Sequence, residues 1–170
     1  MKIAIVYSTK GGTTKECAEL LARELNNCEV RLFDMAKDEP CLSEYDACVV
    51  GFHIRMGKAD KRARAYIKAN AELLKGMKAA YYICCGFVDC FDEYAEKSIP
   101  RALRENAAAV ACLGGSLDPA RFKGFDRFIV KAVRAEILGG GENADQRQDM
   151  CLPTIMEENI SQCAEALKNA

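Results

Sequence analysis

A short stretch near the start of the chain combines hydroxyl side chains with glycines. Its residues are Ser8, Thr9, Lys10, Gly11, Gly12, Thr13 and Thr14. Glycine lets the backbone approach an anion closely. N–H groups in the first turn of a helix have no helical partners, and the helix dipole there favours negative charge. This stretch therefore predicts a loop that binds a phosphate group.

The segments on either side supply the context that a phosphate loop needs. Residues 2–7 are a short apolar run of β-branched and aromatic side chains, which is typical of a buried strand. After the loop, apolar residues recur at helical spacing as far as Leu25. The chain thus predicts a strand, a turn and a helix, with the turn at the helix start.

Two other interpretations compete with the phosphate loop. Thr13 and Glu16 have the spacing of a capping box, in which side chains would satisfy the first N–H groups without a ligand. A nucleotide P-loop needs a lysine directly after its last glycine, and Thr13 stands there instead. The P-loop is excluded on spacing, whereas the capping box remains an alternative.

Length and composition indicate an ordinary globular chain. It has 170 residues, half of them hydrophobic, and a formal net charge of −1. No apolar run approaches the ~18 residues of a membrane helix, and the start of the chain does not resemble a signal peptide. We therefore expect a cytoplasmic protein. The near-neutral charge and the lack of a recognition motif argue against nucleic acid as a partner.

Cysteine is unusually frequent, with ten in the chain. None lies in a C-x-x-C pair or at another spacing typical of zinc or iron–sulfur ligands, so no metal site is predicted. Several lie inside apolar patterns, where a free cysteine behaves as a small hydrophobic residue. Unpaired thiols in a reducing compartment are expected.

Strand-like and helix-like segments alternate along the chain. Strands are predicted at 2–7, 28–33, 47–50, 79–85 and 108–113, and helices after 13, at 58–74, 91–106 and 156–167. Pro100 should kink or split the third of these helices. Residues 116–150 interrupt the alternation with an amphipathic segment at 125–138 and the Gly139–Gly141 run. The pattern predicts one α/β domain over 1–170, with this excursion before the last helix.

The expected architecture is a doubly wound parallel sheet of five strands with helices on both faces. Ligands of such sheets bind beyond the carboxyl ends of the strands, where the strand order reverses. With the order 2-1-3-4-5, three loops converge there: Ser8–Thr14, Phe52–Gly57 and Cys84–Cys90. The first would bind a phosphate, and the other two could hold a flat ring.

These loops resemble those of the flavodoxin-like family of FMN proteins. Residues 8–14 are similar to its phosphate loop, Gly51–Gly57 to its first flavin loop, and Cys85-Gly86 to the start of its second. The resemblance implies FMN as cofactor and a contact set of fifteen residues. They are Ser8, Thr9, Lys10, Gly11, Gly12, Thr13, Thr14, His53, Ile54, Arg55, Met56, Gly57, Cys85, Gly86 and Phe87.

Within the family, the chain is most similar to the menaquinone-dependent protoporphyrinogen oxidase branch. The matching pieces are Ser8-Thr9-Lys10 with Thr14, Ile54-Arg55-Met56-Gly57, and Asp126-Arg127-Phe128 followed by Gly139-Gly140. This resemblance implies an FMN-dependent oxidoreductase that passes electrons from a reduced substrate, such as a porphyrinogen, to a quinone or a protein. Alternatives are a flavodoxin-type electron carrier without its own substrate, and a module that has lost FMN.

Single residues in the two ring loops admit more than one role. His53 is the only histidine, which argues against a Ser-His-Asp or metal–histidine site and leaves a cofactor contact or a solvent-facing position. Arg55 could offset charge on reduced flavin, hold an anionic substrate, or be solvated. Cys84, Cys85 and Cys90 could relay electrons as thiols or simply pack.

Two segments are strongly basic. They contain Lys58, Lys61, Arg62, Arg64 and Lys68, and Arg121, Lys123, Arg127, Lys131 and Arg134. The second is interleaved with phenylalanines, and such basic amphipathic helices favour anionic partners or membrane surfaces. A solvated helix face is the alternative. We predict that residues 121–134 select the partner, with a peripheral membrane contact as one form of it.

Overall fold

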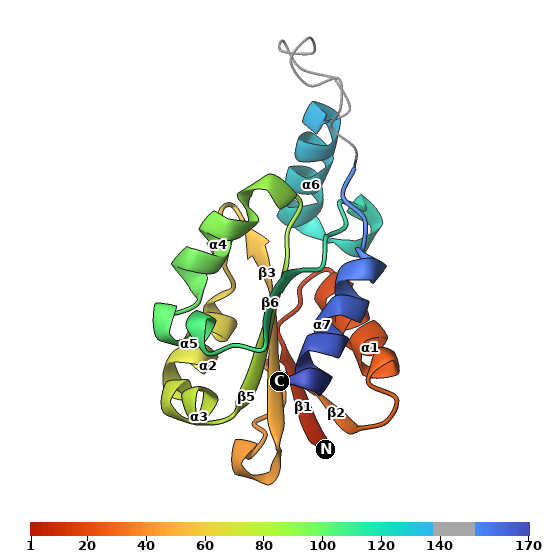
Figure 1. The fold of residues 1–170 in the computed structure, drawn as a ribbon. Coiled ribbons are helices and arrows are strands. Elements are labelled where there is room, and N and C mark those ends of the chain that lie inside the picture. Colours follow the sequence, from red (N-terminus) through yellow and green to blue (C-terminus); the bar gives the residue numbers. More distant parts are fainter. Residues whose placement is uncertain (138–151) are drawn as a thin grey trace.

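A parallel sheet lies at the centre of the computed structural model, which describes residues 1–137 and 152–170 (Figure 1). Its strands are β1 (Lys2–Tyr7), β2 (Glu29–Asp34), β3 (Ala47–Arg55), β5 (Lys78–Cys84) and β6 (Ala109–Cys112). They lie in the order β2-β1-β3-β5-β6, and each neighbouring pair is parallel. The predicted order 2-1-3-4-5 for five parallel strands is confirmed.

Helices cover both faces of the sheet (Figure 1). One face carries α1 (Thr13–Glu24) and α7 (Glu157–Asn169), and the other carries α2 (Lys61–Ala69), α3 (Ala71–Gly76), α4 (Phe91–Ser98) and α5 (Arg101–Glu105). Side chains alternate between the faces of a strand. In β1, Ile3 and Ile5 face α1 and α7, while Ala4 and Val6 face the other core. Burial on both sides explains why β1 is a continuous apolar run.

Strand β3 is longer than predicted. The sequence suggested that it ends at Gly51, but it continues to Arg55 and turns back into β4 (Lys58–Ala59). Gly51 lies inside the strand, and the ring of Tyr82 packs against it; a Cβ there would lie 1.9 Å from Tyr82 Cζ, so this position requires glycine. Met56 and Gly57 form the turn with φ of 49° and 71°, as a tight two-residue hairpin requires.

The helix predicted over residues 58–74 is wrong in two places. Its first residues form β4, and α2 begins only after Asp60, whose side chain accepts a hydrogen bond from Arg62 N at 2.9 Å as the N-cap. Asn70 then separates α2 from α3, and its side chain donates to the carbonyl of Tyr66 at 2.9 Å. The predicted split at Pro100 is confirmed, since this residue separates α4 from α5.

The excursion forms a helix beyond the carboxyl end of the sheet (Figure 1). This is α6 (Gly124–Ile137). Elsewhere, the described residues include the short 3-10 helices η1 (Leu42–Glu44), η2 (Val88–Cys90) and η3 (Pro119–Arg121). The predicted stop at Gly139–Gly141 lies outside the described residues. Across the two described ranges, no helix has the length and apolar character needed to cross a membrane.

Candidate functional site

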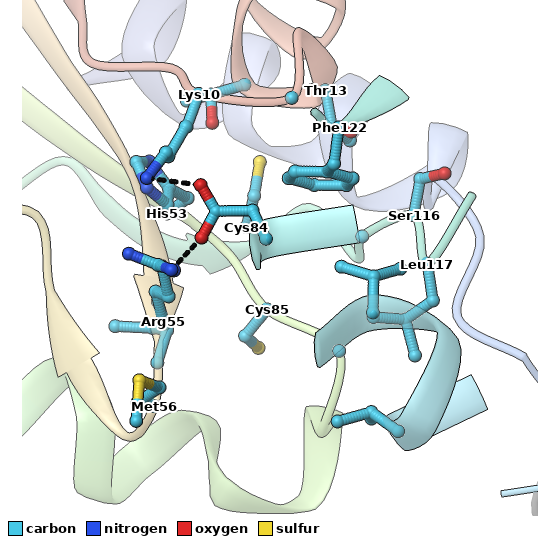
Figure 2. Close-up of a pocket in the computed structure, with 18 of the residues that line it drawn as sticks. Lys10, Thr13, His53, Arg55, Met56, Cys84, Cys85, Ser116, Leu117 and Phe122 are labelled. Carbon is cyan, nitrogen blue, oxygen red and sulfur yellow. Dashed lines mark ion pairs between the residues drawn. The ribbon is translucent and has the colours of Figure 1, made fainter. Parts of the chain in front are cut away.

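A cavity of about 240 Å³ lies between the carboxyl end of the sheet and the excursion (Figure 2). The loops after β1, β3, β5 and β6 form one wall, and Phe122 and α6 form the other. Thirteen of the fifteen residues predicted for the site line this cavity; Ser8 and Gly12 do not. The three predicted loops therefore converge on one space, and their role toward a cofactor stays a prediction.

Ser8 and Gly12 instead hold the first loop in shape. Ser8 is buried, and its hydroxyl donates to Asp60 Oδ1 at 2.7 Å. Gly12 is the N-cap of α1 with φ of 86°, a left-handed conformation that favours glycine. Its N–H donates to Thr9 Oγ1 at 3.0 Å. Both residues position the loop from behind rather than facing the cavity.

The first turn of α1 has no side-chain cap, so the capping box is wrong. Thr13 is already helical, and Glu16 pairs with Arg121 instead, at 2.7 Å from Oε2 to Nη1. In the described part of the chain, the N–H groups of Lys10, Gly11, Thr13 and Thr14 have no recorded acceptor. The loop is thus an open cradle of donors and hydroxyls that fits a phosphate.

His53 lies on β3 where the strand passes the cavity (Figure 2). Its Nδ1 is 3.2 Å from the carbonyl oxygen of Ser8. A carbonyl can only accept, so Nδ1 carries the hydrogen and Nε2 is left as an acceptor. Burial lowers the pKa of His53. The ring is therefore neutral near pH 7 and adds an acceptor, not a charge.

This lowered pKa predicts a pH dependence of stability. The unfolded chain binds a proton at His53 near the ordinary pKa of about 6.5, whereas the folded chain does so only at lower pH. Protonation therefore favours the unfolded state, and stability from this group falls as pH drops below that value. His53→Gln removes this loss. Urea unfolding of both proteins should be measured at several pH values. In acid, the free energy of unfolding of wild type should fall relative to that of the variant. A difference independent of pH would contradict the expectation.

Asp126 on α6 forms ion pairs across the cavity with Lys10 and Arg55, which Figure 2 marks. The distance from Lys10 Nζ to Asp126 Oδ2 is 2.5 Å. Phe122 also crosses the gap, since a Cβ at Gly11 would lie 2.5 Å from the Phe122 Cζ atom. These contacts join the excursion to the loops after β1 and β3 and close the cavity.

Cys84 and Cys85 lie on the side of the cavity nearest the sheet. The hydrogen bond with Cys17 and burial raise the pKa of Cys84, and the hydrogen bond with Cys112 and burial raise that of Cys85. Both thiols are therefore protonated near pH 7, and a protonated thiol is unreactive. Cys90 ends η2 and does not line the cavity. These pKa shifts favour packing over a thiol relay for Cys84 and Cys85.

Sequence reasoning missed the wall that the excursion supplies. Apart from Cys84, which belongs to the predicted third loop, the cavity residues absent from the predicted contact set are Tyr94, Gly115, Ser116, Leu117, Phe122, Asp126, Ile129, Val130 and Val133. One signal was available: Gly114-Gly115 directly follows the fifth strand. A Cβ at Gly115 would lie 2.6 Å from the carbonyl oxygen of Cys85, so this glycine lets two loops of the site touch.

The geometry suits binding and orientation of a planar group that carries a phosphate. A donor-rich cradle lies at one end, two cations lie beside it, and the remaining wall is largely apolar. The thiols are protonated and the imidazole is neutral. Chemistry at this site would come from the bound group, with the protein holding it in place.

Comparison with known sequences points in the same direction. The family model for the flavodoxin domain matches residues 4–144. The chain is also 29% identical over 164 residues to the protoporphyrinogen IX dehydrogenase (quinone) of Escherichia coli strain K12. That alignment covers 87% of this chain and 86% of the relative.

Several solved structures with a similar fold are flavodoxins. A short-chain flavodoxin associated with a bacterial microcompartment aligns with a TM-score of 0.60 at 13% identity, covering 99% of this chain and 97% of that one. Two-electron reduced Megasphaera elsdenii flavodoxin aligns with a TM-score of 0.57 at 13% identity, covering 99% of each chain. At these identities, the likeness concerns the fold alone.

Proposed function

Because the chain belongs to the flavodoxin domain family, we propose that it binds FMN in the cavity and transfers electrons through it. The observation that carries this proposal is the uncapped turn at residues 9–14. The N–H groups of Lys10, Gly11, Thr13 and Thr14 have no acceptor among the described residues, and the turn opens at one end of the cavity. A phosphate group would satisfy those donors.

Each wall of the cavity would have a distinct role. Thr9–Thr14 would hold the phosphate, and the β3–β4 turn and the loop at 85–87 would flank the ring. Met56 is 77% exposed and Phe87 41% exposed, so both stand at the cavity mouth, where they could cover a ring edge. FMN supplies the electron-accepting chemistry when bound, while α6 keeps water away from it.

The finer function we propose is that of an oxidoreductase. It would take electrons from a reduced substrate of the porphyrinogen class and pass them to a quinone or a protein. Support comes from the Escherichia coli relative, whose name gives both that substrate and a quinone. A flavodoxin-type carrier is the alternative, and direct oxidation of a small substrate by the purified protein would separate the two.

We place the partner contact on the outer face of α6. Phe125 and Phe128 are 74% and 68% exposed, and their rings stack with centroids 6.5 Å apart. Arg127 and Lys131 are exposed on the same helix. An apolar pair among cations suits an anionic membrane surface, where a quinone is found. With the cytoplasmic location expected from the sequence, this face would meet the inner leaflet.

FMN should stabilise the protein in a concentration-dependent way. A ligand that binds only the folded state adds about 4 kcal/mol at a thousandfold excess over Kd. Protein stripped of flavin should therefore melt lower than the loaded form, and added FMN should restore the midpoint. FAD should raise it less, because its second phosphate and adenosine need more room than a single phosphate does. Thermal melts of stripped protein with each flavin test this, and equal shifts would count against an FMN site.

A further inference from the structure

The carboxylate of Asp126 occupies an unusual position between two cations from separate loops. Lys10 comes from the loop after β1 and Arg55 from the end of β3, yet both reach the same carboxylate from the side of the cavity (Figure 2). All three residues line the cavity. Only 17% of the Asp126 side chain is exposed, so the carboxylate is largely buried between the two cations.

We propose that Lys10 and Arg55 form a subsite for a carboxylate of the substrate, which Asp126 fills while no substrate is bound. This inference rests on the proposed function and names the substrate class: a flat apolar molecule with a carboxylate at its periphery. The planar guanidinium of arginine matches a carboxylate with two parallel hydrogen bonds. The ammonium group of Lys10 adds a second positive charge beside it.

The two cations are free to take this role while the cofactor is bound. The side chain of Lys10 extends from the loop toward Arg55, away from Thr13 (Figure 2). The unpartnered N–H groups of the cradle stay available to a phosphate, so the phosphate does not need the Lys10 ammonium. One loop can therefore serve two anions, with its backbone facing one and its lysine facing the other.

Exchange of one carboxylate for another is energetically feasible. Lys10 and Arg55 are 46% and 40% exposed, and ion pairs with partners this exposed contribute little net stability. The cavity of about 240 Å³ is also smaller than the roughly 300–1,000 Å³ of common ligand sites. A cofactor and a substrate therefore require α6 to move outward, and that movement withdraws Asp126 from both cations.

The apolar wall argues for a ring rather than a small polar acid. Leu117, Ile129, Val130 and Val133 line the side that faces the loops. A tetrapyrrole with propionate side chains combines an apolar ring and peripheral carboxylates. Such a molecule would pack its ring on this wall and place one propionate between Lys10 and Arg55.

The test compares an acid with its neutral ester in FMN-loaded protein. Protoporphyrin IX and its dimethyl ester share a ring and differ in the carboxylates, and binding of each can be followed by fluorescence. Wild type should bind the acid about tenfold or more tightly than the ester. Arg55→Gln should remove that preference, whereas Asp126→Asn should increase it, since the competing carboxylate is gone. Arg64→Gln, an exposed arginine on α2 outside the cavity, serves as control and should match wild type.

Two outcomes would overturn the subsite. Equal binding of acid and ester by wild type would mean that no carboxylate is recognised. An Asp126→Asn protein that loses the preference as Arg55→Gln does would mean that Asp126 only holds α6 in place. FMN content is measured first: protein that cannot be loaded with FMN refutes the proposed function, whereas loaded protein without acid preference refutes the subsite alone.

Discussion

Protein carrying Gly12→Leu and Thr14→Ala is expected to lose FMN, with Kd raised at least about a hundredfold. Gly12 has a φ of 86°, which leucine rarely adopts, so the substitution displaces the neighbouring N–H groups that form the cradle. The second change removes a hydroxyl that lines the cavity. Hydrogen bonds to charged groups contribute about 1.5–3 kcal/mol each, so the loss of two accounts for a factor of this size. Flavin fluorescence titration of stripped protein measures the Kd.

The same experiment needs a check that the variant still folds. Leucine at position 12 is strained by the left-handed φ of 86°, which lowers stability somewhat. Its Cβ, however, would contact no neighbouring atom. The flavin-free variant should keep a cooperative melt close to that of flavin-free wild type. Gly76→Leu places the same side chain at another open glycine, outside the cavity, and should leave FMN binding unchanged. A folded double variant with wild-type affinity would show that the phosphate binds elsewhere.

The sheet could be predicted from the sequence because its strands are buried on both faces. β1 and β5 are continuous apolar runs, and the alternation with helices leaves few topologies. The end of β3 could not be predicted. Gly51 has the local character of a stop, and its neighbour across the sheet, Tyr82, is what makes glycine necessary inside the strand. That contact is visible only once the strands are paired.

The site also has a part that could be predicted from the sequence and a part that could not. Its three loops follow from the rule that parallel strands present their carboxyl ends at one edge. The wall opposite them does not, because Asp126 meets Lys10 and Arg55 across long sequence separations. The pattern marks residues 121–134 as amphipathic and basic but does not say which charge turns inward. Asp126, the single anion among the five cations of that segment, is the one that does.

The other large effect is expected on the outer face of α6. Replacing Arg127, Lys131 and Arg134 with glutamate should weaken binding to phosphatidylserine-containing vesicles at least about a hundredfold. Each Lys or Arg near an anionic bilayer contributes about 1 kcal/mol, and reversal adds repulsion to that loss. Vesicle sedimentation at low and high salt measures it. Wild-type binding should itself weaken as salt rises, because charge attraction is screened over about 10 Å at 0.1 M.

A matched variant separates a docking face from a simple effect of net charge. Lys61, Arg64 and Lys68 are exposed on α2, outside the cavity, and their replacement by glutamate changes the net charge equally. This variant should bind vesicles as wild type does. Substitution of Phe125 and Phe128 by serine should also weaken binding, since about 1.5–3 kcal/mol accompanies full burial of each ring. The proposed membrane contact is wrong if both charge reversals weaken vesicle binding equally, or if wild type does not bind the vesicles. In either case the outer face of α6 is a solvated surface.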